Sequence, residues 1–342
     1  MKNPNPLTFA WLAACLALVT STNAAEALII PGNNIYSPAI REISGNRYAV
    51  YFGGWLTQAD ARAGKDSIYR TECLLGSRPA CLAPKKVLSP VPFGLTHIND
   101  PSIVKMNLGR APYLVMYTTV LACPSTITLA QCNNDILRYT YIGASTSWAQ
   151  DGINWSKPLN VTDAGWLPAA LRIGNTTYLY MSPFDNSAQL VRLNLGLGGV
   201  AIAAREAVTL ADTTNRPITY GIMNPDVRFD PATGVWHLWA EHFPDGTDKP
   251  SVIKYFSSRD GLRFAQRSNE SLAASRKNYR IGTPSVAPND LCKMVYAQNP
   301  SLERYPEHER AVRVSMDFKI YYQEKCMAEE RLHTMTGGAT TK

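Results

Sequence analysis

Apolar residues recur along this chain in short runs with strand-like spacing, and five of these runs begin with the same step. In each one, a proline follows a polar or aromatic residue and opens an apolar strand, and a turn and a second strand rich in Tyr or Trp come next. The five prolines are Pro38, Pro101, Pro168, Pro225 and Pro284, with spacings of 63, 67, 57 and 59 residues. Near-regular repetition of β-type sequence is typical of radial repeat folds. The pattern predicts an all-β protein with the architecture of a five-bladed β-propeller.

The second strands support the same division of the chain. They begin 8 to 12 residues after the prolines, at Tyr48, Tyr113, Tyr178, Trp236 and Cys292. Helical periodicity is scarce. We expect a single domain over residues 28–327, with blades at about 28–90, 91–162, 163–214, 215–273 and 274–327. Residues 328–342 end in small and polar residues and are expected to form a flexible tail.

The first 27 residues have a different character. Lys2 precedes an apolar stretch from Leu7 to Val19, and small residues follow it. A charged start, a short apolar core and a small-residue region are typical of a secretory signal peptide. The apolar stretch is too short to cross a bilayer, so no transmembrane span is expected. The sequence predicts that residues 1–27 are a signal peptide and that the mature protein is secreted or periplasmic.

Six cysteines follow the predicted signal peptide, and an even number in an exported chain favours disulfides. The spacing favours the pairs Cys73–Cys81, Cys123–Cys132 and Cys292–Cys326, although other pairings stay open. No metal site is predicted, because no CxxC pair occurs and the five histidines are scattered.

The formal net charge of +7 is spread along the chain, with a loose basic cluster in residues 62–86. An acidic polysaccharide or an anionic envelope surface is one partner that such a charge attracts. A solvated basic surface is the simpler interpretation. Nucleic acid is not an expected partner, because an exported chain without a basic-aromatic motif offers no site for it. We expect a monomer.

In a propeller, the first strand of each blade lines the central axis and the second strand returns to the same rim. Carboxylates at that rim are candidates for acid–base chemistry. Asp100 precedes the second proline, Asp226 follows the fourth, and Glu241 ends the second strand of the fourth blade. Trp239 and Phe243 flank Glu241, and an apolar wall raises the pKa of a carboxyl group, as a general acid requires.

The same rim also carries polar and aromatic residues suited to sugar hydroxyls and sugar rings. They are Tyr36, Ser37, Trp55, His97, Asn99, Trp166, Asn224 and His242. Structural roles compete with these assignments. Asp100 can cap a strand through an Asx turn, Asp226 can pair with Arg228, and Trp166 can pack between blades. Glu241 and His242 can be the polar end of a strand that leaves the core.

At this point the chain resembles a known family. The segments Asn99–Val104 and Asp151–Trp155 and the Tyr-rich second strands are similar to the five-bladed family 43 glycoside hydrolases and to the related families 32, 62, 68 and 130. The resemblance covers nearly the whole mature chain as a repeat pattern. It implies three carboxylates: a base entering the first blade, an orienting aspartate entering the second, and an acid entering the third.

Only Asp100 matches that set. Ser37 stands at the position of the base and Trp166 at that of the acid, and neither side chain can replace a carboxyl group unaided. Two functions follow. One is an exported glycosidase acting on a polysaccharide or oligosaccharide, with a site rebuilt from Asp100, Asp226 and Glu241. The other is a non-catalytic propeller that binds glycans or assists envelope polysaccharide assembly. No cofactor is predicted, and whether a calcium ion sits on the axis, as in some relatives, is left open.

Overall fold

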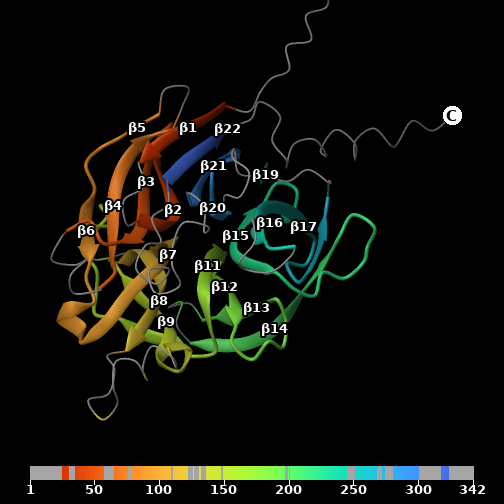
Figure 1. Ribbon diagram of the computed structural model, residues 1–342, viewed down its shortest axis with the longest axis horizontal. Coiled ribbons are helices and arrows are strands. Elements are labelled where there is room, and N and C mark those ends of the chain that lie inside the picture. Colours follow the sequence, from red (N-terminus) through yellow and green to blue (C-terminus); the bar gives the residue numbers. More distant parts are fainter. Residues whose placement is uncertain are drawn as a thin grey trace, which may run out of the picture.

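The computed structural model describes residues 25–30, 35–57, 65–75, 79–108, 111–121, 126, 131, 136–147, 149–196, 199, 201–244, 251–267, 272–273, 280–299 and 317–322. These residues are organised almost entirely as β-strands, which confirms the predicted fold class. Figure 1 shows the sheets arranged around a common centre, with the first strand of each sheet innermost. No helix within the described part of the chain is long and apolar enough to cross a membrane.

The strands form five antiparallel units, here called units one to five. Unit one contains β2 (Ile35–Ser44), β3 (Arg47–Gly54), β4 (Ser67–Leu74), β5 (Ala80–Cys81) and β6 (Lys85–Leu88). Unit two contains the 3-10 helices η1 (Val91–Phe93) and η2 (Ile136–Tyr139), with β7 (Leu95–Leu108), β8 (Ala111–Leu121), β9 (Thr140–Thr146) and β10 (Leu159–Thr162).

Units three and four share one sheet. Unit three contains β11 (Gly165–Ile173), β12 (Thr176–Pro183), β13 (Leu190–Leu195) and β14 (Ile202–Ala211). Unit four contains β15 (Ile222–Asp230), β16 (Val235–His242), β17 (Val252–Ser258), β18 (Arg263–Gln266) and β19 (Leu272–Ala273). Their outer strands β14 and β18 pair in parallel, and this joins the two units into a nine-stranded sheet.

Unit five draws its strands from both ends of the chain. It contains β20 (Arg280–Ala287), β21 (Asp290–Asn299) and β22 (Asp317–Tyr322), and its outermost strand is the N-terminal β1 (Ala25–Ile30). Strand β1 pairs with β22, as Figure 1 shows by their red and blue colours. Residues 25–27, which the sequence assigned to the signal peptide, therefore belong to a strand. The rest of that segment, residues 1–24, and the predicted tail 328–342 lie outside the described residues.

The first strands of the five units form a ring. In order around the centre, β2 contacts β7, β7 contacts β11, β11 contacts β15, β15 contacts β20, and β20 contacts β2 again. Pairing of β1 with β22 adds a chain end to the last unit, so the two ends of the described chain meet in one sheet. Contacts of β2 with β20 and β21 close the ring between the first and last units.

Every first strand begins with the same backbone distortion. Its pairing with the second strand shifts register across the proline step, between residues 36 and 39, 99 and 102, 166 and 169, 223 and 226, and 282 and 285. Four residues before the prolines have positive φ angles: Ser37 at 52°, Asp100 at 47°, Leu167 at 54° and Asn224 at 48°. For a residue with a Cβ this conformation costs roughly 1–2 kcal/mol. A β-bulge redirects the side chain at its centre, and all four side chains line the same axial cavity.

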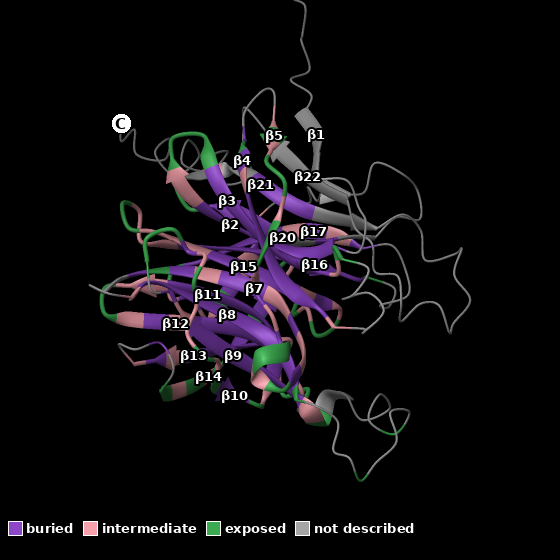
Figure 2. Ribbon diagram, turned by 90° about the vertical axis from the view of Figure 1, so that its left-hand side faces the viewer, coloured by how far each residue is buried: buried purple, intermediate pink, exposed green. Residues whose placement is uncertain are grey.

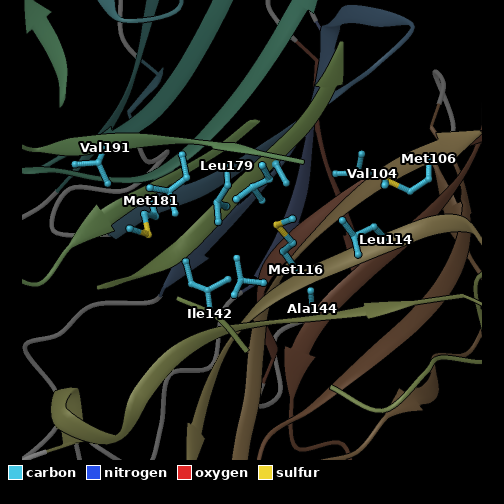
Figure 3. Close-up of a cluster of buried hydrophobic side chains, with 13 residues drawn as sticks. Val104, Met106, Leu114, Met116, Ile142, Ala144, Leu179, Met181 and Val191 are labelled. Carbon is cyan, nitrogen blue, oxygen red and sulfur yellow. The ribbon is translucent and has the colours of Figure 1, made fainter. Parts of the chain in front are cut away.

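The core lies between neighbouring units. Val104, Met106, Leu114 and Met116 of unit two pack with Leu179 and other buried side chains of unit three (Figure 3). Because each sheet is covered on both faces, its second strand is apolar along nearly its whole length, and β8 is buried at nine consecutive positions, 112–120. Figure 2 shows the buried strands at the centre and the exposed turns outside them.

The structure contains the predicted disulfide Cys73–Cys81, which links β4 to β5. The pair Cys123–Cys132 lies outside the described residues. For Cys292–Cys326, the backbone of Cys292 lies in β21, but its side chain and Cys326 are also outside the described part of the chain.

Candidate functional site

The five first strands converge on a narrow axial cavity. Its lining comes from all five units and includes the proline steps of each. At about 30 Å³ it has room for roughly one or two water molecules and none for a sugar ring. The axial cavity itself therefore cannot hold a saccharide, and a saccharide at this end of the molecule would bind at the rim where the first strands begin, which we call the mouth.

Asp66 is the centre of a hydrogen-bond network at the mouth between units one and two. It immediately precedes β4. The Tyr36 hydroxyl donates to Asp66 Oδ2, and Asn99 Nδ2 donates to the same oxygen at 3.2 Å. His97 Nδ1 lies 3.4 Å from it. Asp66 is buried, and its Oδ1 has no hydrogen-bond partner among the described residues.

Asp100 lies beside this network and is less buried. The Ser37 hydroxyl donates to Asp100 Oδ1, which links the two pre-proline residues of units one and two. Burial raises the pKa of the Tyr36 phenol well above its usual value, and the charges of Asp66 and then Asp100 raise it further. The phenol therefore stays protonated at neutral pH and acts as a fixed donor. Two carboxylates thus act on one side chain at the mouth.

Glu241 has a different environment, because it is completely buried between units four and five. Asn224 Nδ2 donates to its Oε2, and Ser251 Oγ donates to its Oε1 at 2.8 Å. A Cβ atom at Gly282 would come within 2.4 Å of the Glu241 carboxyl group. Only glycine at this position leaves room for the carboxylate.

Asp226 is buried on the axis and connects units four and five. Its Oδ1 forms an ion pair with Arg228 Nη1 at 2.8 Å, and its Oδ2 accepts a hydrogen bond from the Val286 amide at 2.6 Å. Burial raises the pKa of Asp226, and the Arg228 charge opposes that effect. These contacts are those of a residue that holds two sheets together.

The predicted aromatic residues are also near the mouth. Trp55 meets Tyr36 edge to face, with ring centroids 6.2 Å apart, and its buried indole N–H has no acceptor among the described residues. Trp166 is partly buried against Phe184, also at 6.2 Å. Burial lowers the pKa of His242 to about 4, and the Lys254 charge adds to the effect, so its imidazole is neutral at pH 7.

The structure thus brings some of the predicted residues together at the mouth and places the others in a different unit. Tyr36, Ser37, His97, Asn99 and Asp100 gather between units one and two. Asn224, Glu241, Asp226 and His242 belong to unit four. The sequence analysis did not include Asp66. A third strand starts at the same rim as a first strand, so the position of Asp66 at the entry to β4 is itself a signal that its carboxylate lies at the mouth.

No family model matches the chain, and no curated protein matches it in sequence. Solved structures do resemble it. The GH43 endo-arabinanase from Bacillus licheniformis has 14% identity and a TM-score of 0.54, over 86% of this chain and 96% of that one. Zg3597, a family 117 glycoside hydrolase from Zobellia galactanivorans, has 11% identity and a TM-score of 0.58, over 93% and 98%.

An N-acetylgalactosamine deacetylase from F. plautii, in complex with blood group B trisaccharide, is similar as well. It has 12% identity and a TM-score of 0.57, over 93% of this chain and all of that one. The likeness to the family 43 glycoside hydrolases predicted from the sequence is therefore confirmed as a likeness of fold. At such low identity the similarity establishes the β-propeller architecture and leaves the reaction open.

Proposed function

We propose that this protein is an exported, five-bladed propeller that binds a saccharide at the mouth and hydrolyses a glycosidic bond there. The observation that carries the proposal is the pair of carboxylates at the mouth, Asp66 and Asp100, which accept hydrogen bonds from the neighbouring side chains of Tyr36 and Ser37. The cycle of contacts from β2 through β20 and back to β2 supports the blade count. The N-terminal segment and the disulfide Cys73–Cys81 support export, since disulfides persist in oxidising compartments.

Hydrolysis of a glycoside needs two carboxyl groups on either side of the scissile bond. One protonates the leaving oxygen, and the other activates water or attacks the anomeric carbon. Asp100 is the better placed to reach a substrate, because it is only partly buried and lines the axial cavity. Asp66, with His97 beside it, would supply the second proton-transfer group.

The rest of the mouth has the chemistry of a saccharide site. Trp55 and Trp166 provide aromatic faces for sugar rings, and Asn99 and His97 provide hydrogen-bonding groups. His97 and Asn99 are only partly buried, so the exposed parts of their side chains can contact sugar hydroxyls. A saccharide bound here would lie across units one to three.

The test is a screen for reducing-end release over a panel of polysaccharides. Asp100→Asn and Asp66→Asn should each lower the rate by about 100-fold or more, the usual contribution of an acid–base group. Their melting temperatures should stay close to that of the wild type. Asp151→Asn is the matched control, since Asp151 is an exposed turn residue, and it should keep full activity. An Asp100→Asn variant with full activity, or one that unfolds, rejects the assigned role.

Binding without cleavage is the second candidate function. It is favoured by Ser37 and Trp166, which stand where the resemblance places a base and an acid. In that case no polymer in the panel is cleaved, but one of them retards the protein in an affinity gel. Trp166→Ala should abolish this retardation, whereas Asp100→Asn should only weaken it. The similarity to a deacetylase agrees with a fold that does not by itself determine the reaction.

A further inference from the structure

A second cavity, of about 730 Å³, lies at the other end of the first strands. It is lined where these strands finish and turn into the second strands, opposite the mouth, and we call it the basal cavity. Its size falls within the range of roughly 300–1,000 Å³ that is common for small-molecule sites. None of the residues described at the mouth lines the basal cavity.

Basic residues recur around the basal cavity. Four of the five first strands place a cation three or four residues after the proline, at Arg41, Lys105, Arg172 and Arg228, and all four line the cavity. Arg228 is neutralised by its ion pair on the axis. The remaining lining holds three cations and one carboxylate, Glu42. The cavity therefore has a positive potential.

Arg41 is the most buried of these charges. Its side chain is buried, its Nη1 donates to the Tyr113 hydroxyl at 2.6 Å, and its guanidinium lies 4.1 Å from the centre of the Tyr113 ring. Its Nε has no hydrogen-bond partner, and it forms no ion pair with any residue that the structure describes. A buried cation without a counter-ion is unfavourable.

The other buried arginines show what is missing. Arg70 pairs with Glu72 at 2.9 Å, and Arg192 pairs with Glu206 at 2.8 Å. Arg41 is buried to a similar degree, but it lines the basal cavity and has no carboxylate partner among the described residues. An anion that enters the cavity would take the place that these glutamates have elsewhere in the fold.

We propose that the basal cavity binds a small anionic ligand through a carboxylate or phosphate group, with Arg41, Lys105 and Arg172 as its cationic contacts. Apolar side chains such as Ile40 and Phe229 line the same cavity and would contact the uncharged part of the ligand. Uronic acid saccharides and sugar phosphates both have this chemistry. The proposal is independent of catalysis at the mouth.

The experiment is calorimetric titration of the wild-type protein in low-salt HEPES with three probes: trigalacturonate, inorganic phosphate and the neutral trisaccharide maltotriose. Lys105→Glu is the main variant, because Lys105 is exposed and its substitution should not disturb folding. Lys85→Glu makes the same charge change on the outer strand β6, outside the cavity. Arg41→Gln tests the buried contact. Asp100→Asn is titrated as well, to separate this site from the mouth.

At least one anionic probe should bind, and Lys105→Glu should weaken it about tenfold or more, as expected for loss of a hydrogen bond to a charged group. Lys85→Glu and Asp100→Asn should leave the affinity within about twofold of that of the wild type, a change of only about 0.4 kcal/mol in binding free energy. Binding of trigalacturonate alone identifies an acidic saccharide, and binding of phosphate alone identifies a phosphate ligand. The proposal is overturned if neither anion binds, if maltotriose binds equally well, or if both lysine variants weaken binding equally.

Discussion

Substitution of Asp226 by alanine distinguishes a structural carboxylate from a catalytic one. The change leaves Arg228, whose side chain is 15% exposed, without its counter-ion, and it leaves the buried Val286 amide without an acceptor. Breaking a buried ion pair costs about 3–5 kcal/mol. Arg228 keeps its hydrogen bonds to the carbonyl oxygens of Val286 and Val227, so the lower end of that range applies. We expect a loss of about 3 kcal/mol in the free energy of unfolding.

With an unfolding entropy of about 2.1 cal/mol/K per residue, 1 kcal/mol corresponds to roughly 1.5 °C in melting temperature for a chain of 342 residues, so Asp226→Ala should melt roughly 4–5 °C below the wild type. The assay is urea unfolding at pH 7 together with calorimetry, with Asp151→Ala as the control for an exposed carboxylate. Asp226→Ala should weaken the contact between β15 and β20 and should leave the hydrogen bonds around Asp66 and Asp100 at the mouth unchanged. Full stability of the variant would contradict a structural role for Asp226. Full stability together with loss of polysaccharide cleavage would instead support the catalytic role predicted from the sequence.

Three further predictions concern stability. Gly282→Ala should destabilise the protein by about 1–3 kcal/mol in urea unfolding, because the added methyl group meets the Glu241 carboxylate. Gly196→Ala, whose added methyl group would make only ordinary van der Waals contacts with Ala201 at 3.8 Å, should be nearly neutral. Burial lowers the pKa of His237 from 6.5 to about 4. The stabilising contribution of the neutral imidazole is therefore complete above pH 6.5 and is lost as the pH falls towards 4. Unfolding curves at about pH 7, 6 and 5 should show this decline in stability, and the decline should be smaller in His237→Gln. Reduction of Cys73–Cys81, a separation of 8 residues, should lower stability by about 2–3 kcal/mol, measured by unfolding with and without dithiothreitol.

The repeat pattern predicted the architecture because it reports a backbone constraint. Each proline step coincides with a register shift between the first and second strands, so the motif that recurs in the sequence is the bulge that recurs in the fold. The Tyr-rich second strands likewise follow from burial on both faces. The role of β1 had no such signal, because nothing in the strand Ala25–Ile30 indicates that it pairs with β22, at the far end of the described chain.

The site was harder to predict, because burial depends on neighbours that the sequence does not identify. Glu241 ends a second strand as expected, but unit five covers it completely at Gly282. Asp226 occupies a position that is small in the other units, and the same crowding encloses it and pairs it with Arg228. Asp66 was missed because its strand neighbours carry no repeated motif.

The bulges also explain why the chemistry of the mouth is asymmetric. Each bulge brings its pre-proline side chain to the axial cavity, yet Ser37 and Asp100 bond to one another, Asn224 bonds to the buried Glu241, and Leu167 between them is apolar. The two carboxylates that accept hydrogen bonds from the side chains of Tyr36 and Ser37, namely Asp66 and Asp100, thus lie on the side of units one and two. If the protein cleaves glycosides, loss of either carboxylate on that side should remove activity to a similar extent. Substitution of Glu241 should instead lower stability first, since its hydrogen bonds with Asn224 and Ser251 stabilise the buried end of strand β16.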